Sequence, residues 1–407
     1  MTFFLRPLQL NAMKISVQTV LNLLHNIIHP VSADLVNHLQ RTAIITWYLS
    51  QRIGLDKTGI GNAFLAGMLH DIGTLSKDRE HLSPGSEGFL DGHEQLAGSM
   101  TAGIRFLQPV TPILENHHTA WSSLGSDDLP VVHHLVNMAD TFELYLRGID
   151  GDFITRRERV ISDFFAQPIQ WPAPLEQALR ESARQDGFWF RLGNPSLPQV
   201  LNAISPLHDH MLDHHDFLEV CQLISKIVDK YSSFTRTHSA SVAHVAARLA
   251  ELYGYDVDMQ EKICIAGYLH DIGKLFTPLH ILEKHGKLES FEYATMKQHS
   301  YKTLVMLHPI SELGDIIRWA ANHHERLDGS GYPFRLGAAS LDIPSRILAV
   351  ADVFTAMTEN RPYRQGMESA KAMAILHEEV RNYRLDRDIV TLLDHNIGSV
   401  KALVAMC

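Results

Sequence analysis

The feature that most constrains this chain is a histidine–aspartate framework that occurs twice, at an offset of 200 residues. The matched residues are His38 with His238, His70 with His270 and Asp71 with Asp271. Between these anchors the two halves align without a gap, and shared residues such as Gly67 and Gly267 keep the same offset. Self-similarity at a fixed offset indicates a duplicated structural unit. We therefore predict one type of domain, present twice.

Each half continues with a later histidine, an adjacent histidine pair and a final aspartate. The first-half set is His38, His70, Asp71, His93, His117, His118 and Asp140. The second-half set is His238, His270, Asp271, His299, His323, His324 and Asp352. Imidazole and carboxylate are ligands that borderline first-row metals prefer, and seven ligands exceed the needs of one ion. The second half therefore predicts a two-metal centre, with Asp271 as the bridging ligand.

Helical periodicity runs through most of the chain, and alternating strand patterns are scarce. Residues 17–28 and 237–253 place apolar side chains at steps of three and four, which is typical of amphipathic helices. The fold class that this pattern predicts is all-α, with two tandem helical bundles. We expect His270-Asp271 to end a helix that turns at Gly273. We expect His299 near the start of another helix, and His323-His324 on a third.

The boundary between the two predicted domains is blurred. Residues 167–174 hold three prolines, and a further cluster of glycine and proline follows from residue 193. We assign 1–207 to the first domain, including a linker from about 167, and 208–407 to the second. The alternative is a helical spacer that fixes the two halves against each other.

Composition excludes some partners. The formal net charge is −10, which argues against nucleic-acid polymers and anionic membranes as partners. No apolar run reaches membrane-spanning length, and the N-terminal segment lacks the features of a signal peptide. The three cysteines form no CxxC pair, so a reducing cytoplasm is the expected setting. The oligomeric state stays open, with a homodimer as one option.

The second half also carries two longer motifs, HDIGK at 270–274 and HHERLDGSGYP at 323–333, followed by RPYR at 361–364. This combination resembles the HD-GYP phosphodiesterases of the HD superfamily, over about 220–380. The resemblance implies a helical bundle around two or three divalent ions, usually iron or manganese. It implies hydrolysis of a cyclic dinucleotide to a linear one, with Asp271 and Lys274 as the catalytic residues. It also implies the substrate-binding residues, which are Lys274, Tyr332, Arg361 and Arg364.

Physical chemistry agrees with these roles. Lysine is a compact point charge suited to one phosphate oxygen, and arginine is a planar fork suited to two. The glycines at 329 and 331 allow a turn that approaches a ligand closely. One departure concerns the metals, because three-metal members of the family carry a glutamate where this chain has Phe234. Two ions are therefore favoured, and the alternative is a third ion held by another carboxylate.

The first half keeps the ligand set but lacks the substrate-binding parts. Thr74 replaces Lys274, and Thr119 follows the histidine pair where the second half has glutamate. The interval from the histidine pair to the final aspartate is 23 residues instead of 29, without a GYP segment, and no RPYR stretch follows. We predict a second metal site that is catalytically silent, because positioning groups supply much of a phosphoryl-transfer rate. The alternative is that these histidines are relics, hydrogen-bonded in a helical core.

The tandem arrangement of the two domains indicates the substrate. Cyclic di-GMP is the default substrate that the family implies. A tandem of an incomplete HD domain and an HD-GYP domain, without a sensor segment, resembles enzymes that degrade 3′3′-cGAMP. We predict hydrolysis of 3′3′-cGAMP to 5′-pApG. The alternatives are a cyclic di-GMP phosphodiesterase that releases 5′-pGpG, an HD-type nucleotide phosphatase, and a receptor that binds cyclic dinucleotides without hydrolysing them.

Overall fold

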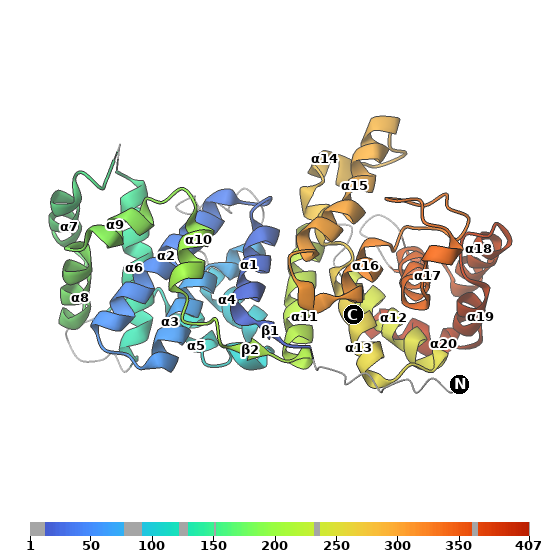
Figure 1. Cartoon of the computed structure of the whole chain (residues 1–407), viewed down its shortest axis with the longest axis horizontal. Coiled ribbons are helices and arrows are strands. Elements are labelled where there is room, and N and C mark those ends of the chain that lie inside the picture. Colours follow the sequence, from blue (N-terminus) through green and yellow to red (C-terminus); the bar gives the residue numbers. More distant parts are fainter. Residues whose placement is uncertain are drawn as a thin grey trace, which may run out of the picture.

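The computed structural model describes residues 13–76, 92–121, 129–149, 152–231, 237–359 and 365–406. In these residues the fold is all-α, as predicted, and the strands are two short segments, β1 (Ile15–Ser16) and β2 (Met211–Leu212). Figure 1 shows the helices arranged as an elongated molecule, with α2–α10 towards one end and α11–α20 towards the other. Across the described parts of the chain, every helix is too short or too polar to span a bilayer.

Ten helices lie in the described part of the first half, and most of them pack against α2, which carries His38. They are α1 (Val17–Ile28), α2 (Ala33–Arg52), α3 (Lys57–Leu69), α4 (His93–Thr101), α5 (Thr111–Asn116), α6 (Val131–Arg147), α7 (Arg157–Phe165), α8 (Ala173–Ala183), α9 (Asp186–Leu192) and α10 (Leu197–Ile204). The described residues of this half also form two short 3₁₀ helices, η1 (Ile72–Ser76) and η3 (Arg105–Leu107).

The second half largely repeats this order as far as the helix that carries the final aspartate. Its helices are α11 (His214–Tyr231), α12 (His238–Tyr253), α13 (Val257–Leu269), α14 (Leu279–Leu282), α15 (Ser290–Leu307), α16 (Asp315–Ala321), α17 (Ile343–Thr358), α18 (Ser369–Arg381), α19 (Arg387–His395) and α20 (Ile397–Met406). Its 3₁₀ helices are η4 (Ile272–Phe276), η5 (Ser311–Leu313) and η6 (Ala338–Ser340).

The helix pairs α2–α3 and α12–α13 show why glycine is shared at the 200-residue offset. A Cβ at Gly67 would lie 2.9 Å from the Cα of Ala43, and one at Gly267 would lie 2.5 Å from the Cα of Ala243. Each pair of helices therefore packs backbone against backbone, with no room for a side chain. This close contact fixes the end of α3 or α13, which is where each HD motif begins.

Residues 173–204, which the sequence suggested as part of a linker or spacer, form α8, α9 and α10. All three helices contact α2. Their apolar faces are buried there, including Leu179, Trp189 and Leu201. This segment therefore packs as part of the first half, while the boundary at residues 207 and 208 stays a prediction.

The two halves meet along β1, β2 and α11 (Figure 1). β1 pairs antiparallel with β2, which immediately precedes α11. Helix α11 contacts η1 of the first half and η4 of the second half. Arg105 reinforces this junction, because its guanidinium lies 2.5 Å from a carboxylate oxygen of Asp216. Since η1 and η4 directly follow the two HD motifs, α11 lies between the two histidine–aspartate clusters.

Candidate metal centres

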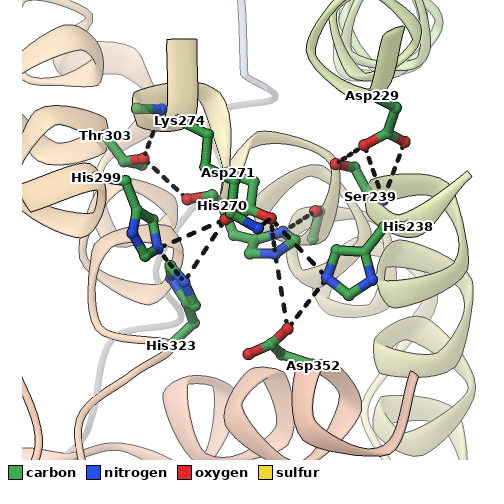
Figure 2. Close-up of polar contacts among 12 residues, drawn as sticks. Asp229, His238, Ser239, His270, Asp271, Lys274, His299, Thr303, His323 and Asp352 are labelled. Atoms are coloured by element: carbon green, nitrogen blue, oxygen red, sulfur yellow. Dashed lines mark hydrogen bonds and ion pairs between the residues drawn. The ribbon is translucent and has the colours of Figure 1, made fainter. Parts of the chain in front are cut away.

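The seven predicted ligands of the second half come from five helices and meet at one place. Figure 2 labels all of them except His324. His238 is the first residue of α12, and His270 and Asp271 join α13 to η4. Asp352 lies on α17. Six of the seven residues are buried, and the side chain of His324 is 22% exposed. This cluster, from His238 to Asp352, is called the second-half centre below.

Two local expectations were wrong. His299 lies in the middle of α15, because a capping box between Glu289 and Glu292 starts this helix at Ser290. His323 and His324 follow the end of α16, where His323 Nδ1 donates to the carbonyl of Ala320 at 2.7 Å. That hydrogen bond satisfies one carbonyl of the last helical turn. In these positions, His299 and His323 face Asp271, and His324 faces Asp352.

Asp271 lies between the two groups of histidines. Its Oδ2 is 3.1 Å from Nε2 of His270 and 3.9 Å from Nε2 of His238. Its Oδ1 is 3.6 Å from Nε2 of His299 and 3.9 Å from Nε2 of His323. Each carboxylate oxygen thus faces a different histidine group. This is the arrangement that a carboxylate bridging two ions requires.

Four of the five imidazole rings face the carboxylates with Nε2, whereas His324 faces Asp352 with Nδ1 at 3.6 Å. Nδ1 of His270 donates to the carbonyl of Gly267 at 2.7 Å, and Nδ1 of His299 donates to that of Met296 at 2.7 Å. In a neutral ring that donates from Nδ1, the lone pair is on Nε2. The Nε2 atoms of His299 and His323 are 3.2 Å apart. Two lone pairs that face each other at this distance repel, and a cation between them removes the repulsion.

Protonation states and buried polar atoms also suit a cation. Burial lowers the pKa of His299 to about 4 and that of His323 to about 3, so both rings are neutral ligands. Burial raises the pKa of Asp271, but the neighbouring charges of His270 and Lys274 outweigh it and hold that pKa well below its usual range. Among the described residues, neither Asp271 Oδ1 nor His270 Nε2 has a hydrogen-bond partner. Buried polar atoms are rarely left without a partner, and coordination of a metal ion would satisfy both.

The residues predicted to bind substrate are partly described. Lys274 forms an ion pair with Asp271, and its side chain is 18% exposed. The ring of Tyr332 lies 4.8 Å from the ring of His324, beside the centre. Arg361 and Arg364 lie outside the described residues, as does Phe234. The roles of all these residues in catalysis and binding stay predictions.

Gly273 and Gly331 are required by packing rather than by turns. A Cβ at Gly273 would lie 2.0 Å from the carbonyl oxygen of His299, so the HD motif rests directly on the backbone of α15. A Cβ at Gly331 would lie 2.4 Å from the backbone nitrogen of Arg326. The expected turn at Gly273 is instead the 3₁₀ helix η4. Only Gly329 of the GYP segment has a positive φ, at 74°.

Sequence reasoning missed three supporting carboxylates. Glu359 accepts a hydrogen bond from Nδ1 of His238 at 3.2 Å, which orients that ring. Glu325 accepts hydrogen bonds from the backbone nitrogens of Phe334 (2.7 Å) and Leu336 (2.9 Å) and thereby holds the segment after the GYP motif. Asp229 on α11 accepts from the backbone nitrogen of Ser239 at 3.0 Å and anchors the start of α12 (Figure 2). Of the three, only Glu325 could have been suspected from the sequence, because it directly follows the histidine pair.

The first half builds an equivalent cluster, called the first-half centre below. Its residues are His38, His70, Asp71, His93, His117, His118 and Asp140. Asp71 Oδ1 is 2.9 Å from Nε2 of His93, and Asp71 Oδ2 is 3.2 Å from Nε2 of His38. Nε2 of His38 is also 3.1 Å from Oδ1 of Asp140. The bridging position of Asp71 thus repeats that of Asp271.

The first-half centre differs in its surroundings. Nδ1 of His38 donates to Glu143 at 2.6 Å, and Glu143 is also paired with Arg147 at 2.7 Å. Thr74 stands in the place of Lys274, and its hydroxyl donates to the backbone carbonyl of Asp71 at 2.6 Å. No lysine or arginine is therefore paired with the carboxylate of Asp71 in the described part of the chain. Both carboxylate oxygens of Asp71 lack a hydrogen-bond partner there, as does Asp140 Oδ1.

Comparisons with known proteins show the family of this chain. Residues 222–389 match the HD domain family. The chain is 30% identical to 3′3′-cGAMP-specific phosphodiesterase 1 of Vibrio cholerae, and the alignment covers 90% of this chain and 88% of that protein. The chain belongs to the HD-GYP family of cyclic dinucleotide phosphodiesterases.

Two further relatives of this HD-GYP phosphodiesterase differ in how much of it they cover. A cyclic di-GMP phosphodiesterase of Thermotoga maritima is 39% identical, over 37% of this chain and 42% of that protein. The crystal structure of a cyclic GMP-AMP-specific phosphodiesterase of V. cholerae covers 95% of this chain and 98% of its own, with a TM-score of 0.60 and 19% identity. That structure shares the fold over both halves. The chain is thus a cyclic dinucleotide phosphodiesterase whose two halves offer clusters that suit metal ions.

Proposed function

We propose that this enzyme hydrolyses 3′3′-cGAMP to 5′-pApG. The observation that supports this substrate is the share of the chain that aligns with each relative. The relative named for 3′3′-cGAMP aligns over 90% of the chain and so includes the first half, whereas the cyclic di-GMP enzyme of T. maritima aligns over 37%. The reaction itself, opening of a cyclic dinucleotide, follows from the family.

The second-half centre is the proposed active site. His238, His270 and Asp352 would hold one ion and His299, His323 and His324 the other, with the carboxylate of Asp271 facing both groups. Iron or manganese suits this mixture of imidazole and carboxylate ligands. When bound, the ions supply positive charge at the phosphate and a water of lowered pKa.

The chain's own residues position the substrate and balance its charge. The side chain of Lys274, next to Asp271, offers its ammonium to the scissile phosphate and so offsets the negative charge that develops there. Tyr332 borders the space beside His324, and Arg361 and Arg364 are proposed to hold phosphate oxygens. In the reaction, a bond forms between a water oxygen and phosphorus, and the bond from phosphorus to the 3′-oxygen breaks. The 3′-oxygen takes up a proton and leaves as a hydroxyl.

Parallel assays on three dinucleotides test this proposal. We expect kcat/KM for 3′3′-cGAMP to exceed the values for cyclic di-GMP and cyclic di-AMP, with 5′-pApG identified by mass spectrometry. A preference for cyclic di-GMP with release of 5′-pGpG would overturn the substrate but keep the reaction. Tight binding of a cyclic dinucleotide without turnover, in protein that contains metal, would establish a receptor instead.

For the first half, we propose a metal centre that does not catalyse hydrolysis. Its support is a pair of buried carboxylates: both oxygens of Asp71 and Oδ1 of Asp140 lack hydrogen-bond partners in the described residues. The Nε2 atoms of His38, His70 and His93 lie 3.2, 3.4 and 2.9 Å from the oxygens of Asp71, a set of donors that suits a cation. The missing counterparts of Lys274 and Tyr332 argue against substrate turnover there.

We expect Asp140→Asn to remove the ions of the first half while hydrolysis continues. Metal analysis of the purified protein should show fewer ions per chain than in the wild type. Chelation with EDTA should lower the melting temperature of the wild type more than that of the variant, because bound ions stabilise only the folded state. An unchanged metal content would contradict the proposal, and the relic interpretation would then stand.

A further inference from the structure

Helix α15 carries a stripe of three large side chains beside the second-half centre. Tyr293, Lys297 and Tyr301 are spaced four residues apart, so they share one face of the helix. Tyr293 is 50% exposed and Tyr301 is 48% exposed. A row of half-exposed aromatic side chains indicates a surface that can bind a ligand.

The stripe faces the GYP segment. Nζ of Lys297 lies 4.9 Å from the ring centroid of Tyr293 and 6.0 Å from that of Tyr332. Further along, the ring of Tyr301 lies 6.3 Å from that of Phe334, which is 47% exposed. Lys297 is therefore positioned between two tyrosine rings, one on α15 and one on the loop.

This group of residues adjoins the metal ligands. The ring of Tyr332 lies 4.8 Å from that of His324 and 6.3 Å from that of His299. A dinucleotide whose scissile phosphate lies at the centre must place its bases within one nucleotide's reach of that phosphate. Tyr332 is next to the ligand His324, Lys297 is next to Tyr332, and Tyr293 is next to Lys297. Tyr293 is exposed, and Lys297 and Tyr332 are partly exposed.

The chemistry of the group suits a purine, and guanine in particular. Nucleobases stack on exposed aromatic rings whatever their identity. Lysine discriminates between them, because guanine presents two acceptors, O6 and N7, on one edge. Adenine presents an amino donor where guanine has O6, and that donor repels an ammonium group.

The first half lacks these residues in its sequence. When His93 is matched with His299, the positions of Tyr293, Lys297 and Tyr301 correspond to Glu87, Asp91 and Gln95. The two acidic residues would repel a nucleotide phosphate, and none of the three is aromatic. The aromatic and cationic stripe is thus confined to the half that is proposed to hydrolyse the substrate.

We propose that Tyr293, Lys297 and Tyr332 form a nucleobase subsite that selects guanine. The proposal rests on the proposed function, since it requires a dinucleotide bound at the second-half centre. Tyr293 and Tyr332 provide the stacking surfaces, and Lys297 reads the O6 and N7 edge. Such a subsite favours dinucleotides that contain guanine over cyclic di-AMP.

The test is Lys297→Met, which removes the charge and keeps the length of the side chain. We expect kcat/KM for 3′3′-cGAMP and cyclic di-GMP to fall by about 10-fold, as expected for the loss of a specific base contact. The value for cyclic di-AMP should stay nearly unchanged. If a dinucleotide is not hydrolysed, its inhibition constant is measured in place of kcat/KM. Lys297→Arg should restore the preference for guanine, because arginine reads the same edge.

Two further variants define the outcomes. Tyr293→Leu should raise KM for all three dinucleotides, about 10-fold, through the loss of stacking. Lys371→Met, on the exposed face of α18, is the control for the change in net charge. An equal loss on all three dinucleotides in Lys297→Met would make Lys297 a phosphate contact and overturn the guanine selection, as would no loss at all. Wild-type protein that hydrolyses none of the three would overturn the proposed function instead.

Discussion

Replacing Asp271 with asparagine is expected to lower kcat by on the order of 10³-fold or more. Asparagine keeps the size of the side chain but loses the charge and one of the two oxygens. In the structure, those oxygens face different groups of histidines, with Oδ2 3.1 Å from His270 and Oδ1 3.6 Å from His299. An amide nitrogen cannot ligate a metal ion, so one ion loses its contact to the bridge.

The duplicated chain provides the control for this substitution. Asp71→Asn makes the same change at the matched position of the first-half centre, where Oδ1 lies 2.9 Å from His93. We expect this variant to lose metal from the first half and to keep most of the hydrolytic activity. Metal content and kcat should be measured on both variants together. A loss of hydrolysis in Asp71→Asn, with the second half still loaded, would place catalysis in the first half or make the two halves interdependent.

If Asp271→Asn retained wild-type turnover with saturating metal, the active site would have been misplaced. A loss of turnover with unchanged metal content would instead assign Asp271 to proton transfer or to substrate binding. The two measurements together therefore separate the bridging role from other roles of the same carboxylate.

The sequence predicted the all-α fold and, from their spacing and chemistry, the residues that meet in the two clusters. Such prediction was possible because imidazole and carboxylate at matched offsets are a chemical signal that does not depend on helix boundaries. The boundaries themselves were less accurate. His299 lies mid-helix because Glu289 and Glu292 cap α15 nine residues earlier, and no ligand pattern reveals a cap.

The carboxylates that orient His38 and His238 could not be predicted, because the two halves place them differently. His38 uses Glu143, three residues after Asp140, whereas His238 uses Glu359, seven residues after Asp352. On a helix, these positions are one and two turns beyond the aspartate. The same hydrogen bond is therefore made from a different turn in each half, so a residue-by-residue comparison of the halves misses it.

The second large effect is expected at Gly273, where alanine should abolish hydrolysis and destabilise the second half. The added Cβ would lie 2.0 Å from the carbonyl oxygen of His299 and 2.8 Å from the backbone nitrogen of Thr303. Both neighbours are backbone atoms of α15, so η4 and α15 must separate. The same motion breaks the hydrogen bonds that Thr303 makes to Gly273 (3.1 Å) and to His270 (2.8 Å).

Overpacking of this kind costs about 1–3 kcal/mol, so the melting temperature should fall by roughly 5–10 °C. Gly398→Ala is the control, because a Cβ there meets no atom within 4 Å and alanine favours the helix α20. The measurements are thermal unfolding and kcat at a temperature where the variant remains folded. Unchanged stability and unchanged hydrolysis in Gly273→Ala would show that the HD motif does not rest on α15.

Gly73→Ala separates the loss of stability from the loss of chemistry. A Cβ at Gly73 would lie 1.9 Å from the carbonyl oxygen of His93, so the steric conflict equals that at Gly273. Both variants should therefore lose similar stability, each in its own half. Only Gly273→Ala should also lose hydrolysis below its melting temperature, because only the second half combines the ligands with Lys274 and Tyr332. Equal losses of hydrolysis in the two variants would mean that the first-half centre controls the second, and α11, which contacts both η1 and η4, is the element that would transmit such control.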